Sequence, residues 1–284
     1  MAETPNTPHS IKHTIAVASG KGGVGKSTVS ANLALALAKS NTPVGLLDCD
    51  IYGPSIHVMF NLKGKSPRAL ADQTIEPLQS LGLHIMSMGL LGGDDKPVIW
   101  RGPMVHNIIQ QFLKGVRWPA LDFLIVDLPP GTGDAQLSLA QQSALTAAAI
   151  VTTPQDISLI DATKGLKMFQ QLNVPVIGII ENMSSFSCPH CGESTKIFKE
   201  GGGRKVADRL AVPFLGSVPI DPQIVIGADA GAPIVHTHPD SPAARAFCEI
   251  AQRIVEQTTI AASQEPPQPD LNLTWKPRPA GFDV

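Results

Sequence analysis

The stretch that decides the fold of this 284-residue chain is Gly20-Lys-Gly-Gly-Val-Gly-Lys-Ser-Thr28. It follows an apolar run, Thr14–Ser19, and opens an Ala- and Leu-rich stretch, Gly25–Lys39. A Walker A phosphate loop requires this context of a strand before it and a helix after it. In such a loop, backbone N–H groups turn inward around phosphate and the helix N-terminus adds its positive dipole end. The sequence therefore predicts a phosphate-binding loop here.

The residues of this loop are expected to have separate tasks. The predicted nucleotide-binding residues are Gly20, Lys21, Gly22, Gly23, Val24, Gly25, Lys26, Ser27 and Thr28. We expect Lys26 to reach the outer phosphates, Ser27 to bind Mg²⁺ and Thr28 to bind the α-phosphate. Lys21 is a second lysine that an ordinary phosphate loop does not need.

Short apolar runs alternate with helix-like stretches along the rest of the chain. The predicted strands are Thr14–Ser19, Val44–Asp48, Leu83–Met88, Phe123–Asp127, Ala148–Thr152, Val176–Ile180 and the weaker Phe214–Val218. The predicted helices are Gly25–Lys39, Met104–Leu113, Ala135–Leu145, Ile157–Leu172, Gly202–Leu210 and Ser241–Glu256. This alternation predicts an α/β fold, a mostly parallel, twisted sheet with helices on both faces. We expect a flexible N-terminus at 1–10, a single domain at 11–260 and a Pro-rich tail at 261–284.

The composition argues against several classes of protein. Hydrophobic residues make up 43% and charged residues 16%, which disfavours disorder. Lys and Arg number 22 against 24 Asp and Glu, so no basic excess exists to bind nucleic acid. The polar start of the chain lacks the blocks of a signal peptide, and no apolar run approaches the length of a membrane span. We expect a cytoplasmic protein that binds neither nucleic acid nor membranes.

Acidic side chains follow two of the predicted strands. Asp48 and Asp50 come at the carboxyl end of one strand, where open α/β sheets bind ligands. Strand alternation would point both to the same side, although such a pair can also cap a turn. Asp127 follows four apolar residues, as in a Walker B strand, and we expect it to hold Mg²⁺ directly or through water.

Two further strand ends carry candidate nucleotide contacts. Gly131 follows two prolines, and its backbone N–H could contact the γ-phosphate as part of a switch loop. Asn182 ends another predicted strand. By itself this position is also consistent with a simple turn residue.

The cysteines supply a second chemistry. Cys188-Pro-His-Cys191 places two thiols at a spacing that can bind one metal ion or one edge of a cluster. A tetrahedral zinc or a [4Fe–4S] cluster takes about four protein ligands, so two chains sharing one site would complete the set. We expect His190 to point outward, and Cys49 and Cys248 to be buried small hydrophobic residues.

Taken together, these motifs resemble a known family. The loop with Lys21 resembles the deviant Walker A of the MinD, ParA and nitrogenase-iron-protein class. With Asp48-Cys-Asp-Ile-Tyr-Gly-Pro-Ser-Ile56, Asp127-Leu-Pro-Pro-Gly-Thr-Gly-Asp134 and the cysteine pair, the chain resembles the Mrp/ApbC family over roughly Ile11 to Gln257.

The resemblance implies a fold, an activity and roles for individual residues. The fold would be that of a MinD-like P-loop NTPase of the SIMIBI class. The activity would be that of an ATP-hydrolysing homodimer, which takes a [4Fe–4S] cluster from a donor onto Cys188 and Cys191 and delivers it to apo-proteins. Lys21 would act in trans on the partner subunit's nucleotide, Asp50 would serve Mg²⁺ and the attacking water, and Asn182 would bind adenine.

The resemblance leaves two features unexplained and two alternatives open. Many bacterial members carry an extra N-terminal domain, whereas here 19 residues precede Gly20, and the Pro-rich tail around Trp275 has no counterpart. One alternative is a MinD- or ParA-type positioning ATPase. It leaves the cysteine pair without a role, and the C-terminal stretch is not a basic amphipathic helix. The other is a zinc-bridged, ATP-binding scaffold, which metal analysis distinguishes.

Overall fold

The computed structural model describes residues 11–72, 74–91, 112, 115–188 and 190–263. The expected flexible N-terminus lies outside this part of the chain. The predicted helix Met104–Leu113 also lies outside it except for Phe112, and so does the predicted tail from residue 264 onward.

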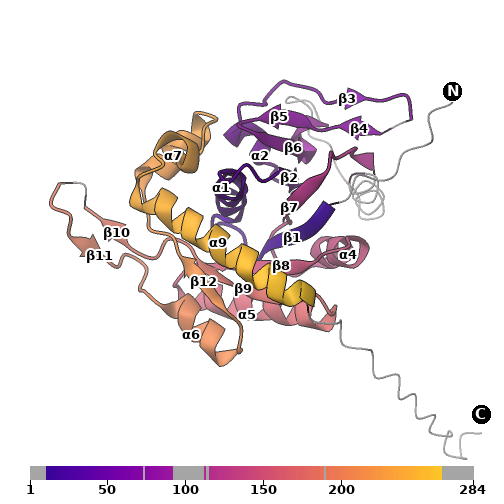
Figure 1. The fold of residues 1–284 in the computed structure, drawn as a ribbon. Helices are drawn as coiled ribbons and strands as arrows, with labels where there is room; N and C mark the ends of the chain where they lie inside the picture. Colours follow the sequence, from indigo (N-terminus) through magenta and orange to yellow (C-terminus); the bar gives the residue numbers. More distant parts are fainter. Residues whose placement is uncertain (1–10, 73, 92–111, 113–114, 189, 264–284) are drawn as a thin grey trace, which may run out of the picture.

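An eight-stranded sheet forms the centre of the molecule (Figure 1). Its order is β12-β9-β8-β1-β7-β2-β6-β5, and every neighbouring pair is parallel except β5 with β6. The strands are β1 (Ile11–Ser19), β2 (Val44–Asp48), β5 (Leu78–Ser80), β6 (Leu83–Ser87), β7 (Leu121–Asp127), β8 (Ala147–Thr152), β9 (Val176–Glu181) and β12 (Phe214–Ser217). The predicted mostly parallel sheet is therefore confirmed.

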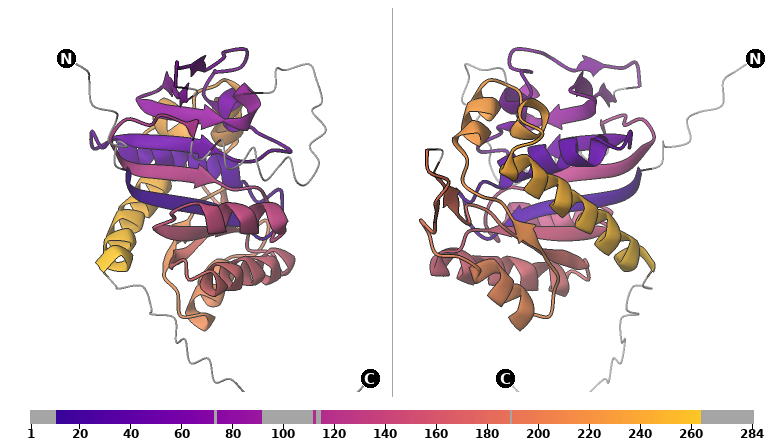
Figure 2. Two further views of the ribbon diagram at one scale, coloured as in Figure 1. Left: turned by 90° about the vertical axis from the view of Figure 1, so that its right-hand side faces the viewer. Right: turned by 60° about the vertical axis from the view of Figure 1, so that its left-hand side comes forward.

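Helices cover both faces of the sheet (Figure 2). One face carries α1 (Lys26–Ala38), packed beneath the long helix α9 (Pro242–Ser263). The other carries α4 (Asp134–Gln142), α5 (Asp156–Gln171) and α6 (Gly202–Arg209). The connection from β1 leads toward one edge of the sheet, whereas those from β7, β8 and β9 lead toward the other edge. Because such crossovers are right-handed, the two sets of helices lie on opposite faces.

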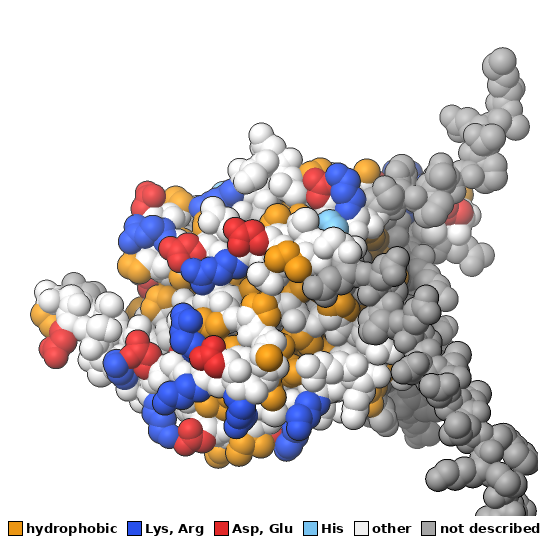
Figure 3. Space-filling model, turned by 60° about the horizontal axis from the view of Figure 1, so that its bottom comes forward, with side chains coloured by type: hydrophobic (Ala, Val, Ile, Leu, Met, Phe, Trp, Pro, Cys, Tyr) orange, Lys and Arg blue, Asp and Glu red, His pale blue; other side chains and the backbone are white. Residues whose placement is uncertain are grey.

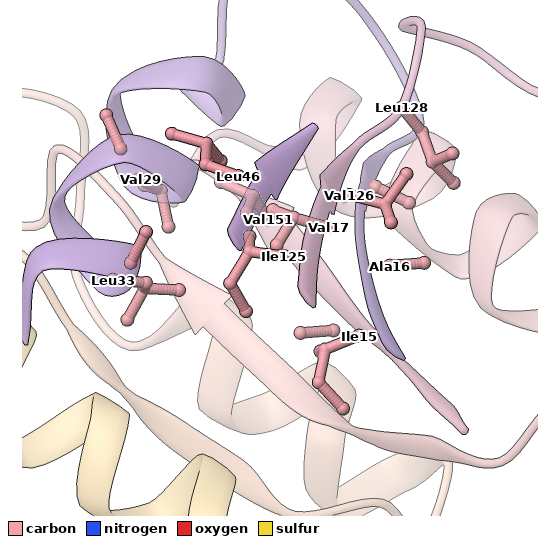
Figure 4. Close-up of a cluster of buried hydrophobic side chains, with 14 of the residues drawn as sticks. Ile15, Ala16, Val17, Val29, Leu33, Leu46, Ile125, Val126, Leu128 and Val151 are labelled. Carbon is pink, nitrogen blue, oxygen red and sulfur yellow. The ribbon is translucent and has the colours of Figure 1, made fainter. Parts of the chain in front are cut away.

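The core lies on both faces of the sheet, and part of it, between α1 and the sheet, is drawn in Figure 4. Ile15 and Val17 of β1 and Ile125 of β7 are fully buried. Val29 and Leu33 of α1 are buried in the same cluster. Continuous apolar strands are what a parallel sheet covered on both faces requires. This packing holds the first turn of α1, and hence the loop before it, rigidly against the ends of β1 and β7.

Short elements that no periodicity predicted complete the fold. They are α2 (Ile56–Met59), β3 (Arg68–Ala69), β4 (Ile75–Glu76), η1 (Met88–Leu90), β10 (Phe186–Ser187), β11 (Ser194–Thr195), α7 (Pro222–Asp229) and α8 (Ile234–Thr237), together with β5. Most span four residues or fewer, too short to show a period.

Helix α9 continues through Ser263, past its predicted end at Glu256 and past the expected domain boundary at 260. Its buried Thr258 packs against the body of the protein, so tertiary contact extends the helix.

Candidate functional site

The candidate nucleotide site lies at the carboxyl edge of the sheet. Connections leave β1 and its neighbours β7 and β8 toward opposite edges, and open α/β sheets bind ligands at the carboxyl edge where the strand order reverses in this way. Seven parallel strands end along this edge, and their last residues are Ser217, Glu181, Thr152, Ser19, Asp127, Asp48 and Ser87, in sheet order. The phosphate loop is the connection from β1 to α1, as predicted.

Two close contacts hold the phosphate loop in place. A Cβ atom at Gly20 would lie 2.1 Å from the backbone carbon of Asp161 in α5. Gly25, with φ +81°, directly precedes α1, and a Cβ atom there would lie 2.2 Å from the side-chain nitrogen of Asn182. At Gly22 and Gly23, by contrast, an added Cβ would meet none of the described atoms within 4 Å. The loop is thus clamped at its ends and open along its middle, where phosphate would bind.

A buried cluster connects the loop to Asp127. Lys26 Nζ lies 2.8 Å from Asp127 Oδ1, and both side chains are buried. The Ser27 hydroxyl donates to Asp127 Oδ2 at 2.6 Å, and Ser30 Oγ donates to Oδ1 at 2.7 Å. Ser30 was not predicted as a site residue, although it follows Lys26 by one helical turn on the buried side of α1.

This donor set fits a magnesium nucleotide. A serine hydroxyl beside a carboxylate offers the oxygen ligands that Mg²⁺ prefers, and the lysine in the first turn of α1 is a cationic group suited to a phosphate. In this structure Lys26 and Asp127 satisfy each other. A phosphate would compete with Asp127 for Lys26, and a cation would compete with Lys26 for Asp127.

Asp48 and Asp50 organise the loop that follows β2. β2 ends at Asp48, so strand alternation does not extend to Asp50, and the expectation drawn from it does not apply. Asp48 Oδ1 accepts the backbone N–H of Asp50, while its Oδ2 accepts the N–H groups of Ser55 and Ile56 and the hydroxyl of Ser87. Burial and the neighbouring charge of Asp127 raise the pKa of Asp48 to about 7. Asp48 thus supports the loop that follows β2.

Asp50 lies at the inner end of the same loop. It is 8% exposed, and its Oδ1 accepts the backbone N–H groups of Tyr52 and Gly53. This contact folds the loop back on itself over four residues. The carboxylate lies directly after the strand that neighbours Asp127 in the sheet.

Gly131 and Asn182 both contact the region of the phosphate loop. The N–H of Gly131 donates to the carbonyl of Ser19 at 3.1 Å, so binding a phosphate would require it to release this bond. Asn182 Nδ2 donates to the carbonyl of Val24 at 2.9 Å. That bond uses one of the two N–H groups of the amide, which leaves one N–H to donate to a base and the side-chain oxygen to accept from one.

The cysteine pair lies on a hairpin formed by β10 and β11, which projects from the body of the protein (Figure 1). Cys188 is partly exposed and Cys191 is exposed. Backbone N–H groups of Cys191 and His190 point at the Cys188 sulfur and lower the pKa of its thiol. The chain closes tightly here, because the N–H of Gly192 donates to the carbonyl of Cys188 at 2.8 Å. The geometry favours a thiolate, the form that binds metal.

The two cysteines need further ligands to bind a metal fully. Among the described residues, no group of three or more His, Cys, Asp and Glu side chains could hold a metal ion. His190 is exposed.

The remaining candidate residues lie at separate places in the fold. Lys21 is partly exposed, and no ion pair within the described residues engages its ammonium group. Cys49 is buried, as expected. Cys248 is not fully buried: it lies beside a groove between α1 and α9, with Lys39 Nζ 3.6 Å from its sulfur. Thr28 lies in the first turn of α1, and its backbone carbonyl accepts a hydrogen bond from the side-chain amide of Asn32.

The surface around the lower helices shows mixed charge. On the face seen in Figure 3, lysine and arginine side chains alternate with acidic ones. The salt bridges Lys164–Asp161 and Lys199–Asp156 are examples from α5 and its surroundings. In the described part of the chain, no helix has the length and apolar character needed to cross a membrane.

The fold and the site together define a P-loop NTPase: a parallel sheet, a glycine-rich loop between β1 and α1, and a buried acid at the end of β7 bonded to the loop serine. Comparison with known proteins narrows this class. A family described as NUBPL iron-transfer P-loop NTPases, within the ParA group, matches residues 10–255. The chain belongs to this family, and the predicted resemblance to the Mrp/ApbC family is confirmed.

Individual relatives agree with this assignment. An iron-sulfur cluster transfer protein NUBPL of Dictyostelium discoideum is 48% identical, covering 90% of this chain and 79% of its own. An iron-sulfur cluster carrier protein of Aquifex aeolicus is 50% identical, covering 85% and 67%. A nucleotide-binding protein of Archaeoglobus fulgidus, solved with ADP, is 40% identical with a TM-score of 0.70, covering 78% and 87%. The cell division ATPase MinD of Pyrococcus furiosus, 23% identical with a TM-score of 0.67 over 87% and 99%, shares the fold.

Proposed function

We propose that this protein is an ATP-hydrolysing carrier of iron–sulfur clusters, which binds a [4Fe–4S] cluster between two copies of the chain and transfers it to apo-proteins. One observation carries the proposal: a nucleotide site and an exposed thiol pair with a lowered Cys188 pKa occur on the same small domain. The names of the relatives, cluster carrier and cluster transfer protein, support it.

The nucleotide half of the proposal assigns roles around the phosphate loop. Lys26 and the loop N–H groups bind the phosphates, while Ser27 and Asp127, together with Asp50, hold Mg²⁺. Mg²⁺ would neutralise charge on the phosphates. Asp50 orients the attacking water. The buried Lys26–Asp127 pair supports these roles, because it brings a cationic group suited to phosphate and a carboxylate suited to Mg²⁺ together at the loop.

The base and the switch loop complete the nucleotide site. The oxygen of Asn182 accepts a hydrogen bond from the exocyclic amino group of adenine, while one N–H of the same amide stays bonded to Val24. A base whose exocyclic group is an acceptor, such as guanine, would face an oxygen there. Gly131 leaves Ser19 and binds the γ-phosphate through its N–H, which would move the loop after β7 when ATP replaces ADP.

The cluster half of the proposal needs two chains. Cys188 and Cys191 of each copy supply two of the four thiolates of one cluster, which is the cargo of the protein. Their place on a projecting hairpin supports sharing across a two-fold axis. In the same dimer Lys21, whose ammonium has no ion pair in the described chain, reaches the nucleotide of the partner subunit.

The proposal is tested by loading the protein with its cargo. The parent and a Cys188→Ala variant are reconstituted without oxygen with iron and sulfide, and iron, sulfide, zinc and native mass are measured. We expect about four irons and four sulfides per dimer in the parent and their loss in the variant. A monomer without iron would contradict the carrier function. A zinc-bridged dimer would favour an ATP-binding scaffold instead.

A matched variant and a transfer assay complete the test. Cys49→Ser removes a buried thiol outside the hairpin and is expected to leave the cluster in place. Loss of the cluster in that variant would contradict the ligand assignment. The loaded parent is then mixed with an apo iron–sulfur enzyme whose activity requires a [4Fe–4S] cluster. Recovery of that activity at a rate no faster than with free iron and sulfide would contradict the transfer step.

A further inference from the structure

The last residue of β9 and the residue after it contact two different parts of the protein. Asn182 reaches the phosphate loop, where its Nδ2 donates to the carbonyl of Val24 at 2.9 Å. Glu181, 1% exposed, points instead to the start of α6. Its Oε1 accepts the N–H of Gly201 at 3.1 Å, and its Oε2 accepts the N–H of Gly203 at 2.6 Å.

The segment between these contacts is the cysteine hairpin. The chain leaves Asn182, forms β10 and β11 with the two thiols between them, and returns at Gly201, the residue that precedes α6. The segment therefore starts at Asn182, directly after Glu181, and its return is bonded to the Glu181 carboxylate. A displacement of the end of β9 would move both ends together.

The glycines at the return point fit this contact. Gly201 has φ +73°, a conformation that other residues rarely adopt. A Cβ at Gly203 would lie 3.0 Å from Glu181 Cβ and 3.2 Å from its Oε2, so a larger residue would press on the carboxylate. The carboxylate also lies at the N-terminus of α6, where free N–H groups and the helix dipole favour a negative charge. The glycines that follow Glu200 therefore leave room for the Glu181 carboxylate at the start of α6.

The contact between Asn182 and the phosphate loop is also close. A Cβ at Gly25 would lie 2.2 Å from Asn182 Nδ2, and Met183 Cε lies 3.7 Å from the same point. Met183 itself has φ +57°. The phosphate loop therefore cannot change shape at Val24 and Gly25 without shifting the strand end that carries Glu181.

We propose that Glu181 is a positioning residue that transmits the state of the phosphate loop to the cysteine pair. Filling of the loop shifts Asn182, and Glu181 passes that shift through Gly201 and Gly203 to the return strand of the hairpin, which changes the exposure of Cys188 and Cys191. The inference rests on the proposed function, since it names how the nucleotide site regulates the thiol site. It concerns the apo-protein as well as the loaded carrier.

The test measures thiol reactivity in the metal-free, reduced protein. Alkylation rates of Cys188 and Cys191 are followed by mass spectrometry with no nucleotide, with ADP and Mg²⁺, and with a non-hydrolysable ATP analogue and Mg²⁺. In the parent we expect nucleotide to change the rate at one or both cysteines by about fivefold or more, the lower range of coupling between sites. In Glu181→Ala we expect this ratio to fall to about one while the protein still binds a fluorescent ATP analogue.

Two further variants separate positioning from general damage. Glu193→Gln removes an exposed carboxylate within the same hairpin and is expected to keep the parent's nucleotide-dependent ratio. Gly203→Ala presses on Glu181 from the opposite side and is expected to weaken the ratio even if Glu181→Ala fails to fold. Glu181→Gln keeps an acceptor for one N–H and is expected to restore part of the ratio.

The outcomes decide the inference independently of cluster binding. It is overturned if the parent's thiols react at the same rate with and without nucleotide, or if Glu181→Ala and Gly203→Ala both keep the parent's ratio. Because the readout uses no iron, a parent that binds a cluster but shows no nucleotide effect would overturn the coupling alone. A parent with the nucleotide effect but no cluster would overturn the carrier function alone.

Discussion

Cys188 shows how a single side chain obtains its chemistry from the backbone around it. The thiol is near the surface, so burial does little to its ionisation. The N–H groups of Cys191 and His190 stabilise the thiolate and lower the pKa below the ordinary value of 9.0. A thiol of this kind is prepared to bind iron before any iron is present.

The lowered pKa of Cys188 can be measured directly. In a Cys191→Ser background the pH dependence of Cys188 alkylation is expected to have a midpoint below 9.0, because the folded backbone favours the thiolate. An unfolded peptide with the sequence of residues 185–194 and the same substitution serves as the control, and its midpoint is expected to be higher. Identical profiles for protein and peptide would show that the hairpin does not activate the thiol.

Asp48 is the opposite case, a carboxyl group whose pKa is raised to about 7 by burial and by Asp127. A group that binds its proton more tightly in the folded state adds stability below its unfolded pKa, and loses that contribution as the pH rises through the folded value. For Asp48 this loss falls between pH 3.8 and about 7. The carboxyl group nevertheless organises the loop after β2, through four accepted hydrogen bonds.

We therefore expect the parent to gain stability relative to an Asp48→Asn variant as the pH falls from 7 to 4. The difference in unfolding free energy between the two is expected to change by roughly 3 kcal/mol over this range, because asparagine does not titrate. Urea unfolding followed by circular dichroism at several pH values measures it. A difference that stays constant with pH would mean that Asp48 ionises normally in the folded protein.

At the scale of elements, the packing of α5 against the phosphate loop fixes where phosphate can bind. Gly20 directly follows β1, and a Cβ atom added there would overlap the backbone of Asp161 and Ala162 in α5. Gly22, two residues later, faces open space. The same glycine-rich motif therefore contains glycines that close packing requires, Gly20 and Gly25, and glycines that face open space, Gly22 and Gly23.

This difference predicts unequal effects of adding one methyl group. Gly20→Ala is expected to destabilise the protein by about 2 kcal/mol or more, because its Cβ would overlap the α5 backbone. Gly22→Ala is expected to leave the melting temperature near that of the parent while weakening nucleotide binding. Thermal unfolding without nucleotide compares the two, and equal melting temperatures would contradict the packing described here.

At the scale of the whole molecule, the nucleotide site and the thiol pair lie at different places along the sheet. The phosphate loop lies over the middle of the sheet, and the cysteine hairpin follows β9 toward the β12 edge (Figure 1). The proposed dimer would bring Lys21 of one chain to the nucleotide of the other. Activity would then depend on two chains at once, which a mixture of variants can test.

Lys21→Ala and Asp50→Asn are each expected to bind ATP and to hydrolyse little of it. When equal amounts are mixed, about half of the dimers are mixed, and each mixed dimer has one complete site, so about a quarter of the parent's hydrolysis rate should return. Phosphate release measures the rate, and each variant alone at the same total concentration is the control. No recovery on mixing, with mixed dimers detected by native mass, would contradict the trans role of Lys21.

Much of the nucleotide site was predictable because its signals are local. The loop at 20–28 and the acid at Asp127 each stand at the end of a buried strand, and parallel strands bring their carboxyl ends to one edge. Ser30 and Glu181 were missed because their partners are distant in sequence: Ser30 bonds to Asp127, and Glu181 bonds to Gly201 and Gly203. Nothing in their immediate neighbours indicates such contacts.

The sequence by itself determined the class of fold, the phosphate loop and the thiol pair, because periodicity, glycine-rich turns and cysteine spacing act over a few residues. Only the tertiary structure decided that Lys26 pairs with Asp127, that Asp48 serves its own loop, and that Glu181 holds the return of the cysteine hairpin. These contacts join residues far apart along the chain. They form because the packed sheet and its helices bring the strand ends to one edge, where burial makes each unpaired polar group costly.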